Sequence, residues 1–192
     1  QCSRDLLDAI GCIVDLHRIR TGRRTLVECA FKIDELAGVA LEQVAERAHD
    51  RCITLVNDVQ PAGVVGDAAL IRRALSALLR HAIAVTPKGG TVHLYAGLTR
   101  AEDRPALWIR VSDQSLPLFP DAERRPLTSL FSNCLAEGDA RRGFTLDDVG
   151  LAFCMAMARL HGGETWVVSR DAAGNEFHCL LPAPPPGEEG DA

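Results

Sequence analysis

The stretch DAALIRRALSALLRHAIAVTPKGG, residues 67–90, decides the fold. Its apolar residues recur at three- and four-residue spacings, which is typical of a helix with one broad apolar face. Asp67 stands just before this pattern, where a carboxylate can accept hydrogen bonds from the free backbone N–H groups of the first turn. Thr86 to Gly90 is a turn signal, because it combines a proline with two glycines. The stretch predicts a long, well-buried helix that ends in a sharp turn.

On the C-terminal side of this helix, apolar residues alternate with polar ones at Val92, Leu94, Ala96 and Leu98, and again at Leu107, Ile109 and Val111. Alternation with period two predicts half-buried strands, so we expect a hairpin. Residues 113–148 have little periodicity and predict a long irregular segment, which is usually functional or disordered. The remaining expected elements are a helix at 149–160 ending at His161-Gly162-Gly163, strands at 165–169 and 176–181 around a turn at 171–174, and a tail.

On the N-terminal side, residues 3–20 predict a helix with one apolar face. Residues 24–31 are expected to be extended, and Asp34 is expected to cap a second helix. A strand should follow from Ile53 and end near Pro61. Helices and strands are mixed without regular βαβ alternation, so we expect an α+β fold, a two-layer sandwich of a mixed sheet and helices.

The composition limits the function. A length of 192 residues fits one main domain, and 47% hydrophobic residues provide a full core. A net charge of −5 argues against a nucleic-acid partner, since phosphate binding needs a basic surface. No apolar run approaches the ~18 residues of a membrane span, and no signal peptide is evident. We expect a cytoplasmic domain, which leaves open a membrane anchor in a longer parent protein.

The seven cysteines show no C-x-x-C spacing. An odd number without this spacing argues against both a disulfide framework and a zinc site. We therefore expect reduced, buried thiols and no bound metal.

Several segments, in order, resemble the ATP-binding domain of histidine kinases, whose fold is shared with gyrase B. Residues 13–26 resemble the end of the family's second dimerisation helix, and residues 67–90 resemble its N-box helix and turn. WIRVSD, residues 108–113, resembles the strand that enters the G1 box, and residues 150–182 resemble the end of the G2 box, the H-G-G turn and the closing strands. The resemblance implies a dimerisation helix over 1–22, an ATP-binding-like domain over 23–182 and a linker or tail over 183–192.

The N box of this family supplies one or two asparagines that bind magnesium through side-chain oxygen atoms, and Mg²⁺ prefers such hard ligands. The corresponding residues here are Ala77 and His81. Alanine has no ligand atom, and imidazole suits softer metals. Without a ligand role, His81 is expected at the edge of the core.

The G1 box, D-x-G-x-G in the family, corresponds to Asp113-Gln114-Ser115-Leu116-Pro117. The aspartate that would accept a hydrogen bond from adenine is kept, and both glycines are replaced. Pro117, at the position of the second glycine, fixes the backbone and removes an N–H donor. An aspartate after a strand is also a common turn residue, so Asp113 alone is a weak signal.

The G2 box, G-x-G-L-G-L in the family, corresponds to residues 146–151 and keeps only Gly150 and Leu151. Asp147 and Asp148 stand where the family's backbone N–H groups hold the phosphates. If they point inward, like charges about 4 Å apart cost on the order of 4 kcal/mol at an effective dielectric of 20. The alternative is that one of them caps the following helix.

These positions predict a vestigial nucleotide pocket formed by Ala77, His81, Lys88, Asp113, Asp147, Asp148, Gly150 and Leu151. The leading interpretation is a pseudokinase or regulatory phosphotransfer module that binds no cofactor. Its expected partners are a response regulator or receiver domain, and a second copy through the dimerisation helices. No catalytic residue is expected within this sequence, because the resemblance places the phosphoaccepting histidine upstream of residue 1.

Two alternatives remain. One is an active but divergent kinase that uses ATP with Mg²⁺, supported by Asp113, Lys88, Gly150 and the H-G-G turn. The other is a pocket for an apolar ligand, suggested by Ala77, Ala84, Val85 and Leu116.

Overall fold

The computed structural model describes residues 2–119, 123–130, 146–170 and 174–183. A six-stranded sheet with strand order β2-β4-β5-β8-β7-β6 forms one layer. Its strands are β2 (Thr54–Asn57), β4 (Thr91–Ala101), β5 (Arg104–Ser112), β6 (Arg125–Pro126), β7 (Glu164–Arg170) and β8 (Gly174–Pro182). β2 pairs parallel to β4 and the other neighbours are antiparallel, so the sheet is mixed. The predicted α+β class is confirmed.

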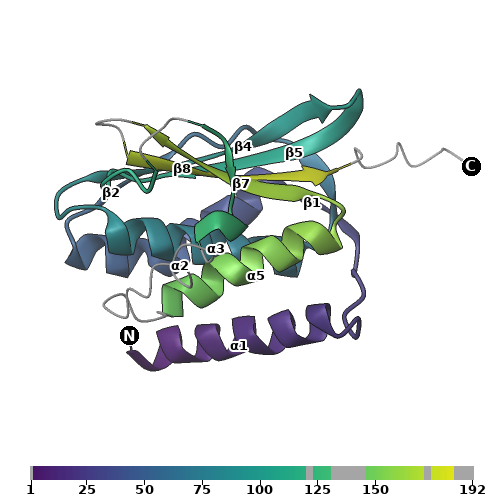
Figure 1. Cartoon of the computed structure of the whole chain (residues 1–192), viewed down its shortest axis with the longest axis horizontal. Helices are drawn as coiled ribbons and strands as arrows, with labels where there is room; N and C mark the ends of the chain where they lie inside the picture. The colour runs from purple at the N-terminus through teal and green to yellow at the C-terminus, as the bar shows by residue number, and fades with distance from the viewer. Residues whose placement is uncertain (1, 120–122, 131–145, 171–173, 184–192) are drawn as a thin grey trace, which may run out of the picture.

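Helices α2 (Ile33–Asp50), α3 (Ala68–Val85) and α5 (Leu146–Leu160) form the second layer, against one face of the sheet (Figure 1). α1 (Cys2–Arg20) lies along the far side of α5, away from the sheet. A small two-stranded sheet pairs β1 (Cys29–Lys32) with β3 (Gly63–Gly66). The core lies between the two layers, where Leu75, Leu79 and Phe153 are fully buried.

The central helix follows the prediction closely. α3 begins after Asp67, whose Oδ1 accepts a hydrogen bond from the Leu70 backbone N–H at 3.1 Å. It ends at Val85, directly before the predicted turn. The hairpin of β4 and β5 is also confirmed.

Several boundaries differ from the predictions. α2 begins at Ile33 and its N-cap is Lys32, so Asp34 lies inside the first turn rather than at the cap. β3 was not predicted, because four residues of GVVG carry too little periodicity to identify a strand. Strand β2 is shorter than expected, although the N–H groups of Asp58 and Gln60 still bond to carbonyls of β4. The chain therefore follows β4 beyond the strand itself.

The expectation of buried thiols is confirmed for Cys12, Cys154 and Cys179 and is wrong for Cys29 and Cys52, which are exposed. Cys29 opens β1 at the surface, and Cys52 follows the end of α2 with a left-handed φ of 56°. Burial raises the pKa of the Cys179 thiol to about 12 and raises that of Cys154 well above its ordinary value. These two thiols are therefore protonated and unreactive at neutral pH.

Candidate functional site

Asp113, the residue that follows β5, is at the centre of a buried polar network. It is 1% exposed, and its Oδ1 accepts hydrogen bonds from the backbone N–H and the hydroxyl of Ser115, both at 2.8 Å. Oδ1 also accepts from the backbone N–H and the side-chain amide of Asn175, both at 3.3 Å. The other oxygen, Oδ2, is buried and has no hydrogen-bond partner among the residues that the structure describes. A buried carboxylate oxygen without a donor is costly, and a bound amino group would satisfy it.

Asn175 ties this network to the neighbouring loop. Its side-chain amide donates to the Ser115 hydroxyl at 2.8 Å and to the Leu116 carbonyl at 3.1 Å. Its carbonyl oxygen accepts from the Ser169 hydroxyl at 2.7 Å and from the Leu118 backbone N–H at 2.9 Å. These bonds hold the loop that carries Pro117 over the ends of β7 and β8, without the two glycines of the family motif.

Gly174 is required for this arrangement. Its φ is +89°, and a Cβ added there would lie 2.0 Å from the Asp113 carbonyl oxygen. The chain can approach Asp113 this closely only without a side chain. Sequence analysis missed Asn175 and Ser169, because they lie 62 and 56 residues from Asp113 and only the sheet brings them together. Ser115 could have been found, since a serine two residues after an aspartate often forms a local side-chain turn.

At the opposite end of the predicted pocket, helices α3 and α5 contact each other. Ala77 on α3 is 1% exposed, and a Cβ added at Gly150 would lie 3.0 Å from the Cβ of Ala77. Gly150 is therefore needed for the close approach of α3 and α5. Leu151 is also buried in the core, so both surviving residues of the G2 motif have a packing role.

His81 lies one turn further along α3 and is 4% exposed. Its ring meets the ring of Phe177 edge to face, with centroids 5.0 Å apart and planes at 78°. The expectation of a histidine at the edge of the core is wrong, because Phe177 extends the core over it. Phe177 and Asn175 are two residues apart on β8, so they lie about 7 Å apart along the strand.

The two acidic residues of the G2 segment lie in a helix. α5 begins at Leu146, three residues earlier than predicted, so Asp147 and Asp148 belong to its first turn rather than to the cap position. Negative charge in the first turn of a helix is favoured by the helix dipole. Lys88 is exposed in the turn after α3, and Leu116 is 87% exposed. Residues 131–145 lie outside the described part of the chain.

Asp67 joins three elements around this site. Its Oδ2 accepts from Arg24 and from the Val27 backbone N–H, both at 3.1 Å, while its own N–H donates to Nε2 of His161 at 3.2 Å. Nδ1 of His161 lies 2.8 Å from the Met157 carbonyl oxygen, so Nδ1 can donate to that carbonyl while Nε2 accepts from Asp67. The linker after α1, the start of α3 and the end of α5 are thus held together.

A family model described as "Histidine kinase-, DNA gyrase B-, and HSP90-like ATPase" matches residues 66–185, which include every predicted site residue. The chain belongs to this family. It is a histidine-kinase catalytic domain of the two-component type, as its relatives also indicate.

Among these relatives, the circadian input-output histidine kinase CikA of Synechococcus elongatus is 30% identical over 92% of the chain and 23% of its own length. The adaptive-response sensory kinase SasA of Trichormus variabilis is 30% identical over 90% of the chain and 42% of its own length. MprB of a Mycobacterium species, a signal transduction histidine-protein kinase/phosphatase, is 33% identical over 98% of the chain and 35% of its own length. The chain thus spans less than half the length of each of these relatives.

Solved structures agree on the fold. Full-length ShkA in complex with AMPPNP superposes with a TM-score of 0.73 at 21% identity, over 96% of the chain and 37% of that structure. The Acinetobacter baumannii histidine kinase AdeS has a TM-score of 0.68 at 16% identity, over 90% of the chain and 76% of that structure. In the described residues, no helix is long and apolar enough to cross a membrane.

The histidine-kinase fold implies ATP with Mg²⁺, and the two ends of the site differ in how well they fit it. The unsatisfied Oδ2 of Asp113 fits the exocyclic amino group of a base. Ala77 offers no metal ligand, and His81 is packed on Phe177. Within the described ranges, no group of three or more His, Cys, Asp or Glu side chains could hold a metal ion. Among the described residues, Asp113 thus fits a base, and the two N-box positions supply no oxygen ligand for magnesium.

Proposed function

We propose that this domain acts as a pseudokinase-type module of a two-component signalling protein. In this proposal it transfers no phosphoryl group of its own, and it works through dimerisation and through contact with a receiver domain. Its relatives are histidine kinases, but the proposal that this chain has lost that activity rests on its own residues.

One observation carries the proposal, namely the contact of Ala77 with Gly150. The side chain at the N-box position points at a helix and carries no oxygen that could bind a metal. His81, four residues later, packs edge to face on Phe177, so both N-box positions make packing contacts, one with α5 and one with β8. Phosphoryl transfer relies on metal ions that neutralise the developing charge, so a site without the metal ligand loses the main source of catalysis.

The exposed face of α1 supports the proposed dimer. One side of α1 is docked, since Cys12 is buried and Arg73 on α3 donates to the Gly11 carbonyl at 3.2 Å and pairs with Asp15. Four large apolar side chains of α1 are exposed, namely Leu7, Ile10, Ile13 and Val14, at 42–68%. An apolar stripe of this kind on a helix is suited to packing against other helices.

The alternative is an active, divergent kinase, and the buried, unsatisfied Oδ2 of Asp113 favours it. A chain that had no use for a base would be expected to satisfy or remove this oxygen. The alternative requires a metal ligand other than the asparagine that Ala77 replaces.

Calorimetric titration of the 192-residue chain with ADP, ATP and a non-hydrolysable ATP analogue, with and without Mg²⁺, separates the two. We expect dissociation constants in the millimolar range or weaker that Mg²⁺ leaves unchanged. Micromolar affinity that depends on Mg²⁺ would overturn the proposal. In that event the His81→Ala variant should be titrated next. If His81 binds the metal, the variant should lose the Mg²⁺ dependence of its nucleotide affinity. If His81 only packs, that dependence should remain.

A further inference from the structure

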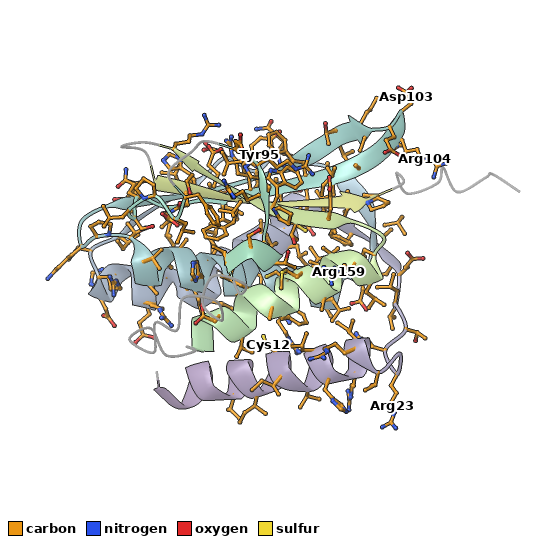
Figure 2. All side chains as sticks on the ribbon, viewed as in Figure 1. Cys12, Arg23, Tyr95, Asp103, Arg104 and Arg159 are labelled. Carbon is orange, nitrogen blue, oxygen red and sulfur yellow. The ribbon has the colours of Figure 1, made fainter. Side chains whose placement is uncertain are left out.

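A hollow of about 550 Å³ lies at the corner where α5 ends and β7 begins. Its lining includes Pro126 at the end of β6, Thr165 and Trp166 of β7, and Arg159, which Figure 2 labels on the C-terminal part of α5. The volume is within the range of sites for small organic ligands, and a bare inorganic anion would leave most of it empty. None of the predicted pocket residues lines this hollow, so a ligand here would not depend on the nucleotide site.

The walls of the hollow are held in place by the sheet and by the H-G-G turn. β6 pairs with β7 along one wall. Leu127 is 2% exposed, and its N–H donates to the Thr165 carbonyl at 3.4 Å. A Cβ added at Gly163 would lie 2.2 Å from the Leu180 carbonyl oxygen, so the turn packs directly on β8. A site that is already formed in this way needs little further ordering when a ligand binds.

Both faces of the Trp166 ring are covered, so only its edge can meet a ligand. The ring is stacked on that of His178 on β8, with centroids 4.8 Å apart and planes at 4°. The guanidinium of Arg124, just before β6, lies 3.8 Å from the centre of the same ring. Because β7 lies between β8 and β6, these two neighbours cover opposite faces of the indole. Its N–H lies on the edge and has no hydrogen-bond partner among the described residues.

The groups of the lining that are still available are hydrogen-bond donors. Arg159 is exposed, and its guanidinium has no hydrogen-bond or ion-pair partner in the described part of the chain. The Thr165 hydroxyl and the Trp166 indole N–H likewise have none there. The one carboxylate among the described lining residues, Glu164, is already paired with Arg124. The hollow therefore has one uncompensated positive charge and an excess of donors, which complements an anion.

We propose that this hollow binds a small organic anion, either a carboxylate or a phosphate monoester, that has an apolar body. The guanidinium of Arg159 donates paired hydrogen bonds to the anionic group, since its planar fork matches both carboxylates and phosphates. The Trp166 indole N–H and the Thr165 hydroxyl add two neutral donors, and Pro126 contacts the apolar body. The domain thus has a small-molecule site that is separate from the nucleotide pocket.

The test is ¹H–¹⁵N correlation NMR on the full 192-residue chain, titrated with phenyl phosphate, benzoate and benzyl alcohol. The chain has two tryptophans and therefore two indole N–H resonances. That of Trp108, which donates to Nδ1 of His178 at 3.1 Å, is the internal reference. We expect phenyl phosphate, benzoate or both to shift the Trp166 resonance saturably, with a Kd on the order of 1 mM. The tighter of the two identifies the anionic group, and benzyl alcohol, which has the ring without the charge, should cause no saturable shift.

Arg159→Gln removes the charge from the end of α5 and should weaken this binding at least about tenfold. Arg23→Gln is the matched control, because Arg23 is also exposed, has no partner among the described residues, and changes the net charge equally. It should leave the Kd unchanged. The absence of a saturable shift with either anion up to about 20 mM would overturn the proposal. Equal affinity in R159Q would also overturn it, and so would equal binding of benzyl alcohol, since the hollow would then be an apolar site.

Discussion

The two ends of the predicted pocket differ in what surrounds their side chains. At the base end, Asp113 lies among polar groups and one of its oxygens still lacks a donor. At the phosphate end, Ala77, Gly150 and His81 make apolar and ring contacts. The base end depends on hydrogen bonds between segments far apart in the sequence, and the phosphate end depends on the packing of two helices.

This difference separates the residues that the fold needs from those that only a ligand would need. The fold needs Gly150 for the contact between α3 and α5, and it needs Gly174 for the approach to Asp113. At position 77 it needs only a small side chain beside Gly150. Four substitutions would break or sharpen the comparison, and they follow in order of expected effect.

Gly174→Ala should cause the largest loss, because the new Cβ would meet the Asp113 carbonyl oxygen at 2.0 Å while φ is +89°. We expect about 3–5 kcal/mol less unfolding free energy, measured by urea denaturation. Gly89→Ala is the control, since Gly89 has a similar φ of +83° and nothing within 4 Å of the added Cβ. It should cost only about 1–2 kcal/mol. Equal losses would mean that backbone strain alone, and not the contact with Asp113, makes Gly174 necessary.

Asp113→Ala should lower the unfolding free energy by about 2–4 kcal/mol, because it leaves the buried donors of Ser115 and Asn175 without an acceptor. Asp113→Asn keeps an oxygen at the Oδ1 position and should cost clearly less. The same variant replaces the unsatisfied Oδ2 by a donor, so any ADP affinity should fall tenfold or more, as calorimetry can determine. An unchanged ADP affinity would show that Asp113 has become purely structural.

The outer side of β8 offers a test by pH, since it carries His178 while the helix side carries Asn175 and Phe177. Burial lowers the pKa of His178 to about 4, against the opposing pull of Glu176, and its Nδ1 accepts a hydrogen bond from the Trp108 indole at 3.1 Å. Between pH 6.5 and about 4 the unfolded chain binds a proton there and the folded chain does not. Stability should therefore be complete above pH 6.5 and decrease by about 2 kcal/mol as the pH falls to 4.

His178→Gln should flatten this part of the pH profile in thermal or urea unfolding. If the slope persists in the variant, carboxylates or other histidines control the acid sensitivity of the domain.

Gly150→Ala should cost about 1–2 kcal/mol, because the new Cβ would lie 3.0 Å from that of Ala77. Ala77→Gly in the same chain should recover part of this loss, and the double-mutant cycle measures the coupling directly. Strictly additive losses would mean that α3 and α5 shift apart instead of competing for this space.

Much of the fold could be predicted from local patterns. The cap at Asp67, the apolar stripe of α3 and the alternation in β4 and β5 are encoded within short segments, and each was confirmed. The boundaries of α2 and α5 were predicted less well, because acidic residues near a helix start fit a cap and a first turn equally. The two-residue strand β6 and the four-residue strand β3 could not be predicted, since they exist only through pairing with β7 and β1.

The candidate site shows the same division. The sequence alone predicted that Ala77 and His81 stand at the positions of the family's metal-binding asparagines and that Asp113 is kept, because motif positions are compared residue by residue. Only the tertiary structure decided that Ala77 faces Gly150, that His81 packs on Phe177, and that Asn175 reaches back to Asp113. The reason is that spacing along the chain sets a residue's place in its own helix or strand, whereas the partner across the core is chosen by packing and by the need to satisfy buried polar groups.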